Sequence, residues 1–255
     1  MLLAIDIGNT NITLGVFDGE NLYATYRLAT HVNQMPDEYA VFILSLLKQR
    51  GIDTTDITEG AISCVVPPLI TTFNELFKKY FDIEPLAVGP GVKTGVRIRM
   101  DNPREVGSDR IANAAGAHSL YSGPIIVVAM GTATAFDTIS KEGDYLGGAV
   151  APGLAISAEA LFTRTAALPR VALVSPKKAI GTNTVTAMQS GIIYGYAGLI
   201  DGVVARIQEE LGEKATVVAT GGLASIIAKE TKVIEKVNPN LTLIGIKVIH
   251  DMNRG

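Results

Sequence analysis

The residues best suited to chemistry lie in a short polar stretch near the start of the chain, between two apolar runs. Asp6 stands near the end of the first run, Gly8 follows, and amide and hydroxyl side chains come next, at Asn9, Thr10, Asn11 and Thr13. Because Gly8 lets the backbone turn sharply and lets an anion approach, the backbone N–H groups of such a turn can bind phosphate. Asp6 can hold a hydrated Mg²⁺ that bridges phosphates. An ordinary hairpin with a polar turn is the alternative interpretation.

The same arrangement recurs in the second half of the chain. There an apolar run leads to Gly131 and Thr132, which open a Gly-Thr-x-Thr turn before another apolar run. When the two copies are aligned on Gly8 and Gly131, Ala129 takes the place of Asp6. A further strand and turn contain Thr220-Gly221-Gly222. Two polar phosphate-type turns and a later Gly-Gly turn are what a two-lobed nucleotide site requires.

Charged residues gather over residues 97–113, where arginines alternate with acids. Gly107 and Ser108 precede an Ala-rich helical run, so we expect Ser108 to be the N-cap. Asp109 and Arg110 then fall in the first helical turn. A carboxylate there can accept the proton of a substrate hydroxyl, as a kinase aspartate does. We expect the helix terminus to lower the pKa of Asp109, which would make it a weak base that acts through its position. Alternatively, Asp109 and Arg110 only cap and salt-bridge the helix end.

Length and composition predict a globular protein. The chain has 255 residues, of which 47% are hydrophobic, so it can form one large domain or two small ones. The formal charge of -3 gives no reason to expect nucleic acid or an anionic membrane as a partner. No apolar run reaches the roughly 18 residues of a membrane span, and no signal peptide is recognisable. The single cysteine, Cys64, excludes an internal disulfide. We therefore expect a soluble, cytoplasmic protein.

Hydrophobic spacing predicts the elements that position these residues. The first ~90 residues are expected to run three strands, helix, strand, helix, strand. Pro36 opens the first of these helices and Gly51 marks its end, while the second is predicted over residues 69–80. This mixed order indicates an α/β lobe with helices covering the sheet.

A long helix is predicted in the second half, over about residues 187–211, after a polar turn at residues 181–184. It carries glycines at Gly191, Gly195, Gly198 and Gly202. Because each glycine costs roughly 0.5–1 kcal/mol relative to alanine inside a helix, close approach of another element is the expected reason. A packed subunit interface is our first interpretation, and packing within the lobe is the alternative.

Four motifs together resemble the type III pantothenate kinase family, and the match runs through nearly the whole chain. They are residues 6–10, residues 103–110, residues 131–134 and residues 220–222. The sequence Gly-Ser-Asp-Arg at 107–110 is specific, whereas a lone Asp-x-Gly-x-Thr indicates only the wider superfamily of acetate kinases, sugar kinases, Hsp70 and actin. The resemblance implies an α/β fold of two actin-like (ribonuclease H-like) lobes, each a mixed β-sheet flanked by helices. We expect the lobes at residues 1–117 and 118–255, and the resemblance implies a homodimer.

The resemblance also implies the activity: ATP-dependent phosphorylation of pantothenate to 4'-phosphopantothenate, the first step of coenzyme A biosynthesis. The residues implied to bind ATP are Asp6, Ile7, Gly8, Asn9, Thr10, Asn11, Ile12, Thr13, Gly131 and Thr132. Those implied to hold pantothenate are Gly107, Ser108, Asp109, Arg110 and Thr184. In this assignment Asp109 accepts the proton and Mg²⁺ is carried with ATP near Asp6. A monovalent cation, K⁺ or NH₄⁺, is also implied.

Two positions depart from the family pattern. Ala129 stands where the family usually has the Asp that is associated with the monovalent cation, and Met100 stands where many members have Tyr. The first departure leaves the cation requirement open, although Asp137 could replace the lost carboxylate. The second would weaken one substrate contact. Two alternative functions therefore stay open: a catalytically weakened homologue acting as a regulatory or accessory binding protein, and another small-molecule kinase or phosphatase of the superfamily.

Overall fold

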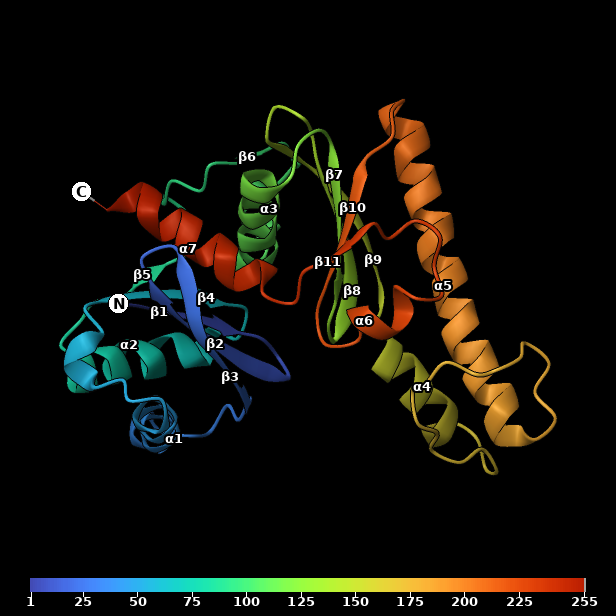
Figure 1. Cartoon of the computed structure of the whole chain (residues 1–255), viewed down its shortest axis with the longest axis horizontal. Coiled ribbons are helices and arrows are strands. Elements are labelled where there is room, and N and C mark those ends of the chain that lie inside the picture. Colours follow the sequence, from blue (N-terminus) through green and yellow to red (C-terminus); the bar gives the residue numbers. More distant parts are fainter. Residues whose placement is uncertain (255) are drawn as a thin grey trace. The chain divides into compact units, whose positions relative to one another are not determined.

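The chain folds into two compact units, whose elements are labelled in Figure 1. The computed structural model describes residues 1–254. The first unit comprises residues 1–96, residues 101–119 and the C-terminal segment from Leu241, and the second comprises residues 97–100 and 120–240. The expected lobes, residues 1–117 and 118–255, differ from these units chiefly in that C-terminal segment, which packs within the first unit.

The sheet of the first unit has the strand order β3-β2-β1-β4-β5 in the described part of the chain. The strands are β1 (Leu2–Ile7), β2 (Asn11–Asp18), β3 (Asn21–Ala29), β4 (Glu59–Cys64) and β5 (Leu86–Ala87). β1 is antiparallel to β2 and parallel to β4. Because side chains alternate along a strand, Leu3, Ile5 and Ile7 enter the main core of this unit, while Asp6 lies on the opposite face of the sheet.

Two helices cover the core face of this sheet, α1 (Pro36–Gln49) and α2 (Pro67–Phe81) (Figure 1). Both helices begin with proline at the first position, where its missing N–H costs nothing. The Glu38 carboxylate accepts the Met35 N–H at 2.8 Å and closes the start of α1. The rings of Tyr39 and Phe73 pack with centroids 5.0 Å apart and join the two helices. Both predicted helices are thereby confirmed. The unit also contains two short 3₁₀ turns, η1 (Thr54–Asp56) and η2 (Pro103–Glu105).

The other face of the sheet carries α7 (Leu241–Asn253), which crosses α3 (Ser108–Leu120) at close range. A Cβ on Gly245 would overlap the Ala112 carbonyl group, and one on Gly116 would meet the backbone of Leu241 and Gly245. The Thr242 hydroxyl also donates to Asn113 Oδ1 at 2.8 Å. These contacts hold the C-terminal helix in the first unit, although it lies more than 120 residues further along the chain than α3.

The second unit repeats the strand plan of the first. Its order is β11-β10-β7-β8-β9-β6 among the described residues. The strands are β6 (Arg97–Ile98), β7 (Ile125–Met130), β8 (Ala133–Ile139), β9 (Asp144–Pro152), β10 (Thr216–Thr220) and β11 (Lys236–Val237). Like β1, β7 is antiparallel to the strand that follows it and parallel to a later strand, here β10. The prediction of a mixed α/β fold with a repeated hairpin is confirmed.

The helices of the second unit are α4 (Leu154–Thr163), α5 (Thr184–Leu211) and α6 (Ala224–Ile227). α5 begins three residues earlier than predicted, because the Asn183 side chain accepts the Thr186 N–H at 2.9 Å and caps the helix there. Its buried stripe, which includes Ile193, Ile200 and Val204, packs into the core of this unit. No helix within residues 1–254 is long and apolar enough to cross a membrane.

Candidate active site

The turn between β1 and β2 is held in shape by hydrogen bonds of its own backbone and of Thr30. The Gly8 N–H donates to the Asn11 carbonyl oxygen at 3.0 Å. The Thr30 hydroxyl donates to the Gly8 carbonyl oxygen at 2.7 Å, and the Thr30 N–H donates to that of Thr10 at 3.1 Å. Thr30, which the sequence analysis did not single out, therefore fixes two carbonyl groups of this turn.

The residues of this turn present different groups to solvent. Asn9, Thr10 and Asn11 are exposed, while Ile7 and Ile12 are fully buried and face each other across β1 and β2. The buried pair can contribute to ligand binding only through the backbone. The predicted hairpin is confirmed, and its exposed tip consists of the amide and hydroxyl side chains that the sequence indicated.

Asp6 lies just before this turn with one oxygen out of reach of water. In the described part of the chain its Oδ1 is buried and has no hydrogen-bond partner. Burial and, next, the negative charge of Asp109 raise the pKa of Asp6 from its usual 3.8 to about 7, while a hydrogen bond with Ser63 acts in the opposite direction. A buried carboxylate oxygen without a donor suits a cation, and Mg²⁺ is often bound through one or two carboxylates together with phosphates. Asp6 thus fits the metal-binding role that the sequence suggested.

The start of α3 is joined to β4 through the Ser108 hydroxyl. That hydroxyl accepts the Cys64 N–H at 2.9 Å and lies 3.1 Å from the Cys64 carbonyl oxygen. The predicted N-cap role of Ser108 is wrong, because the helix begins at Ser108 itself and the Gly107 carbonyl accepts the Ile111 N–H at 3.1 Å. Ser108 instead attaches the helix to the strand beside the one that carries Asp6.

Asp109 is mostly buried in the first turn of α3. Its Oδ1 accepts the Arg110 N–H at 2.8 Å, and a Cβ on Gly107 would come within 2.6 Å of that oxygen, so glycine leaves room for the carboxylate. Burial raises the pKa of Asp109, although the backbone and charge of Arg110 oppose the rise. The predicted lowering of this pKa is wrong, because desolvation outweighs the helix terminus. A raised pKa makes Asp109 a stronger base than a surface aspartate.

The first unit thus brings together Asp6 and the Gly-Ser-Asp-Arg motif. These residues come from the end of β1 and the start of α3, about 100 positions apart in sequence. The coulombic effect of Asp109 on Asp6 shows that the two carboxylates are electrostatic neighbours. This unit therefore combines a polar hairpin turn, a buried carboxylate with an unpartnered oxygen and a second carboxylate with a raised pKa.

In the second unit, the turn after β7 is enclosed by two other loops. The Gly131 N–H donates to the Ala133 carbonyl oxygen at 2.9 Å, and the Gly153 N–H donates to that of Thr132 at 3.1 Å. A Cβ on Gly153 would overlap the Thr132 carbonyl, and one on Gly221, whose φ is +99°, would overlap the Met130 carbonyl. The Gly-Gly turn of the sequence analysis therefore packs directly beside the second polar turn. Thr184, also predicted to bind substrate, is the exposed first residue of α5.

The strand registers place Ala129 where the first unit has Asp6. Asp6 pairs with Thr13 on β2 and Ser63 on β4, and Ala129 pairs with Ala135 on β8 and Thr220 on β10. Asp137 lies two residues beyond Ala135 on the same face, is fully buried, and accepts a hydrogen bond from the Tyr145 hydroxyl at 2.6 Å. Asp137 therefore does not occupy the position of the missing carboxylate.

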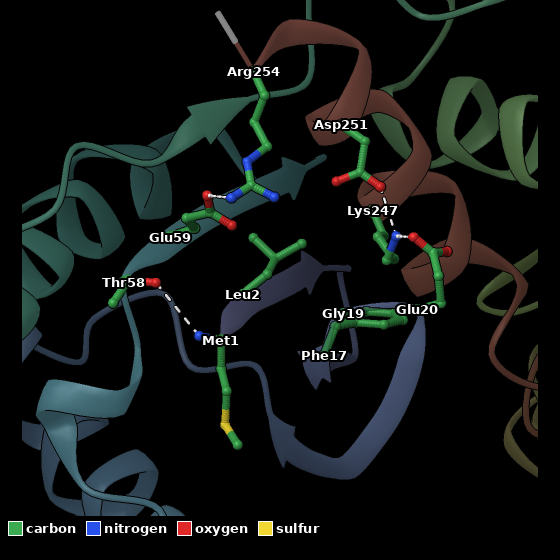
Figure 2. A pocket seen from close by; sticks show the side chains of 10 residues that line it. All are labelled: Met1, Leu2, Phe17, Gly19, Glu20, Thr58, Glu59, Lys247, Asp251 and Arg254. Carbon is green, nitrogen blue, oxygen red and sulfur yellow. Dashed lines mark hydrogen bonds and ion pairs between the residues drawn. The ribbon is translucent and has the colours of Figure 1, made fainter.

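A pocket of about 530 Å³ lies at the other end of β1, near Leu2, and contains none of the predicted site residues (Figure 2). Its cationic side chains are paired with carboxylates: Lys247 with Glu20 at 2.9 Å and Asp251 at 2.6 Å, and Arg254 with Glu59 at 2.5 Å. These ion pairs balance the charges that line the pocket, so they give no reason to place the chemistry there.

The repeated sheet, with a polar hairpin turn after the central strand of each unit, defines an actin-like fold of the kind used by ATP-dependent sugar and acid kinases. Component A of (R)-2-hydroxyglutaryl-CoA dehydratase from Acidaminococcus fermentans shares this fold, with a TM-score of 0.56, 13% identity and coverage of 99% of each chain. An inorganic polyphosphate/ATP-glucomannokinase from Arthrobacter sp. strain KM has a TM-score of 0.51 at 13% identity, covering 98% of this chain and 97% of the other.

Sequence comparison identifies the family. The model of type III pantothenate kinase matches residues 2–206. A type III pantothenate kinase of Dehalococcoides mccartyi strain CBDB1 is 53% identical over 253 residues, which cover 99% of this chain and 96% of that protein. A type III pantothenate kinase of Roseiflexus castenholzii is 53% identical over 254 residues and is covered completely, as is this chain. The chain belongs to the type III pantothenate kinase family.

Proposed function

We propose that this protein transfers the γ-phosphoryl group of ATP to the primary hydroxyl of pantothenate, the first step of coenzyme A biosynthesis, in the cytoplasm. Family membership over the whole chain supports this reaction. The observation that carries it in the structure is the pair of carboxylates in the first unit, with Asp6 beside a phosphate-type turn and Asp109 buried with a raised pKa.

The nucleotide is bound by backbone and side-chain groups of residues 6–13, together with Gly131 and Thr132 of the second polar turn. Ile7 and Ile12 act through their N–H and C=O groups, because their side chains are buried. Asp6 would hold Mg²⁺, which would supply positive charge that stabilises the transferring phosphoryl group.

Pantothenate is held by Gly107, Ser108, Asp109, Arg110 and Thr184. As the substrate oxygen attacks the γ-phosphorus, Asp109 accepts its proton, and ADP leaves with the electron pair of the broken P–O bond. The guanidinium of Arg110 binds either the substrate carboxylate or the transferring phosphoryl group, since both are anionic. The backbone bond from Arg110 to Asp109 orients the base for this step.

The monovalent cation that the family implies lacks its usual carboxylate in this chain, because Ala129 takes that position. We therefore propose that K⁺ or NH₄⁺ stimulates this protein less than relatives that have Asp there. Asp137 is engaged by Tyr145 and lies two positions further along its strand, so we do not assign it this role.

We also propose a homodimer that forms through α5. Gly191, Gly195 and Gly198 are exposed on one face of this helix, and a Cβ on any of them would meet no described atom within 4 Å beyond the adjoining residues and the helix's own nearby backbone. Packing within the unit therefore does not explain them. A partner helix at close range would, since glycine lets two helix backbones approach.

Replacement by leucine tests this interface. Gly195→Leu and Gly198→Leu should convert a dimer to a monomer in size-exclusion chromatography with light scattering. Asn74→Leu, at an exposed position of α2, should leave the mass unchanged. A dimer that persists in both glycine variants would place the interface elsewhere, and a wild-type monomer would reject the dimer itself.

Product analysis tests the function. Purified protein is incubated with ATP, Mg²⁺ and pantothenate in Na⁺, K⁺ or NH₄⁺ buffer, and 4'-phosphopantothenate is measured by mass spectrometry together with ADP. In each buffer, we expect one ADP to form for every 4'-phosphopantothenate. Absence of the phosphorylated product in every buffer would reject the enzyme function and favour an accessory binding protein.

A further inference from the structure

Ser63 carries a buried hydroxyl group that has no role in the proposed reaction as described above. It lies on β4 directly opposite Asp6 in the parallel register, and its side chain is fully buried. Its Oγ donates to Ser108 Oγ at 3.1 Å, and its position beside Asp6 lets the hydroxyl favour the anionic form of that carboxylate. Ser63 therefore stands between the carboxylate proposed to hold Mg²⁺ and the first residue of the helix proposed to hold pantothenate.

The two hydroxyl groups have two protons for three contacts: Ser108 with Cys64, Ser108 with Ser63, and Ser63 with Asp6. Ser108 can donate either to the Cys64 carbonyl oxygen or to Ser63, and Ser63 can donate either to Asp6 or to Ser108. When Ser63 donates to an anionic Asp6, its lone pairs are left to accept from Ser108. When Ser63 donates to Ser108 instead, Ser108 is left to donate to Cys64. The orientation of the Ser108 hydroxyl is thus linked to the orientation of the Ser63 hydroxyl at Asp6.

We propose that Ser63 is a positioning residue that couples nucleotide binding at Asp6 to alcohol-substrate binding at the start of α3. A nucleotide that orders the Asp6 carboxylate also orients the Ser63 hydroxyl beside it. Ser63 then sets the direction of the Ser108 hydroxyl, which the alcohol substrate contacts. By reciprocity, each ligand then tightens the binding of the other. This proposal rests on the proposed function, because it takes Mg²⁺-ATP and pantothenate as the two ligands.

Calorimetric titration measures the coupling without turnover. The non-hydrolysable analogue AMP-PNP with Mg²⁺ is titrated into the protein with and without saturating pantothenate, and the ratio of the two dissociation constants gives the coupling. We expect wild type to bind AMP-PNP at least about 5-fold more tightly when pantothenate is present. In Ser63→Ala this ratio should fall towards 1, by at least about 3-fold, which corresponds to the loss of one net hydrogen bond. Wild-type coupling in Ser63→Ala would overturn the proposal.

Thr242→Val is the matched control, because it also removes a hydroxyl bond to α3, at Asn113, without contact to Asp6. Its coupling ratio should equal that of wild type, and an equal loss in both variants would show that Ser63 acts only through the stability of α3. If Ser63→Ala does not fold, Ser63→Cys keeps the volume with a weaker donor and should show a reduced ratio, so an undiminished ratio would count against the coupling role. Wild type that binds neither ligand would reject the proposed function, whereas wild type that binds both independently would reject only the coupling.

Discussion

Asp6 and Asp109 are electrostatic neighbours in the first unit, and the charge of Asp109 helps to raise the pKa of Asp6 to about 7. Asp6 lies near the end of β1, a central strand of the sheet, and Asp109 lies in the first turn of α3. Two partly desolvated anions destabilise each other unless a cation or a hydrogen-bond donor is present. The pair therefore favours a ligand that brings positive charge to Asp6 and a hydroxyl proton to Asp109.

Asp6→Asn should remove a pH dependence of stability. The folded protein keeps the Asp6 proton up to about pH 7, while the unfolded chain loses it near its usual pKa of 3.8. The free energy of unfolding therefore contains a contribution that falls as the pH rises through this window. We expect the variant to be more stable than wild type by on the order of 4 kcal/mol above that window, in Mg²⁺-free buffer, and about equally stable below it. Urea denaturation across this pH range measures the free energy of unfolding of both proteins. If this free energy changes with pH in the same way in both, the raised pKa of Asp6 is contradicted.

Thr30→Val should weaken nucleotide binding. It removes the hydroxyl that holds the Gly8 carbonyl at 2.7 Å while keeping the size of the side chain. We expect KM for ATP to rise about 3- to 10-fold, the value of one hydrogen bond, with a smaller change in kcat. Thr30→Ser should restore KM, and Thr25→Val, at an exposed position of β3, the strand that ends just before Thr30, should leave it unchanged. An unaltered KM in Thr30→Val would show that the turn does not need this contact.

Ala129→Asp should introduce or strengthen a response to K⁺. The substitution places a carboxylate at the position that matches Asp6, between Ala135 and Thr220. Initial rates in K⁺, NH₄⁺ and Na⁺ buffers of equal ionic strength measure the response. Ala129→Asn, which has the same shape without the charge, serves as the control. An identical salt response in all three proteins would reject the idea that this position controls the cation.

Local signals explain which parts of the site could be predicted from the sequence. Gly8 and Gly131, with polar neighbours at fixed spacing, mark turns because only a few residue types allow them. Pro36, at the first helical position, and the helical spacing of the apolar residues that follow it mark α1. The Gly-Ser-Asp-Arg motif marks the start of α3, and its place beside Asp6 follows once β1 and β4 are paired.

Contacts between distant segments explain what the sequence did not reveal. Ser63 lies in an apolar strand and looks like any small core residue until Ser108, 45 positions away, is packed against it. Thr30 gains its role only when β3 returns past the first turn. The pKa of Asp109 depends on how deeply the folded chain buries it, which the helix position alone does not give.

Asp109→Asn tests the central claim most directly, because it keeps the shape of the side chain and removes its ability to accept a proton. We expect kcat to fall by about 10²- to 10⁴-fold, the usual contribution of a general base. Binding of AMP-PNP and pantothenate should stay within about 3-fold of wild type, since the charge is the main change. Asp101→Asn, at an exposed acid nearby, should retain wild-type kcat. Turnover by Asp109→Asn at a rate near that of wild type, with both ligands bound normally, would contradict the account.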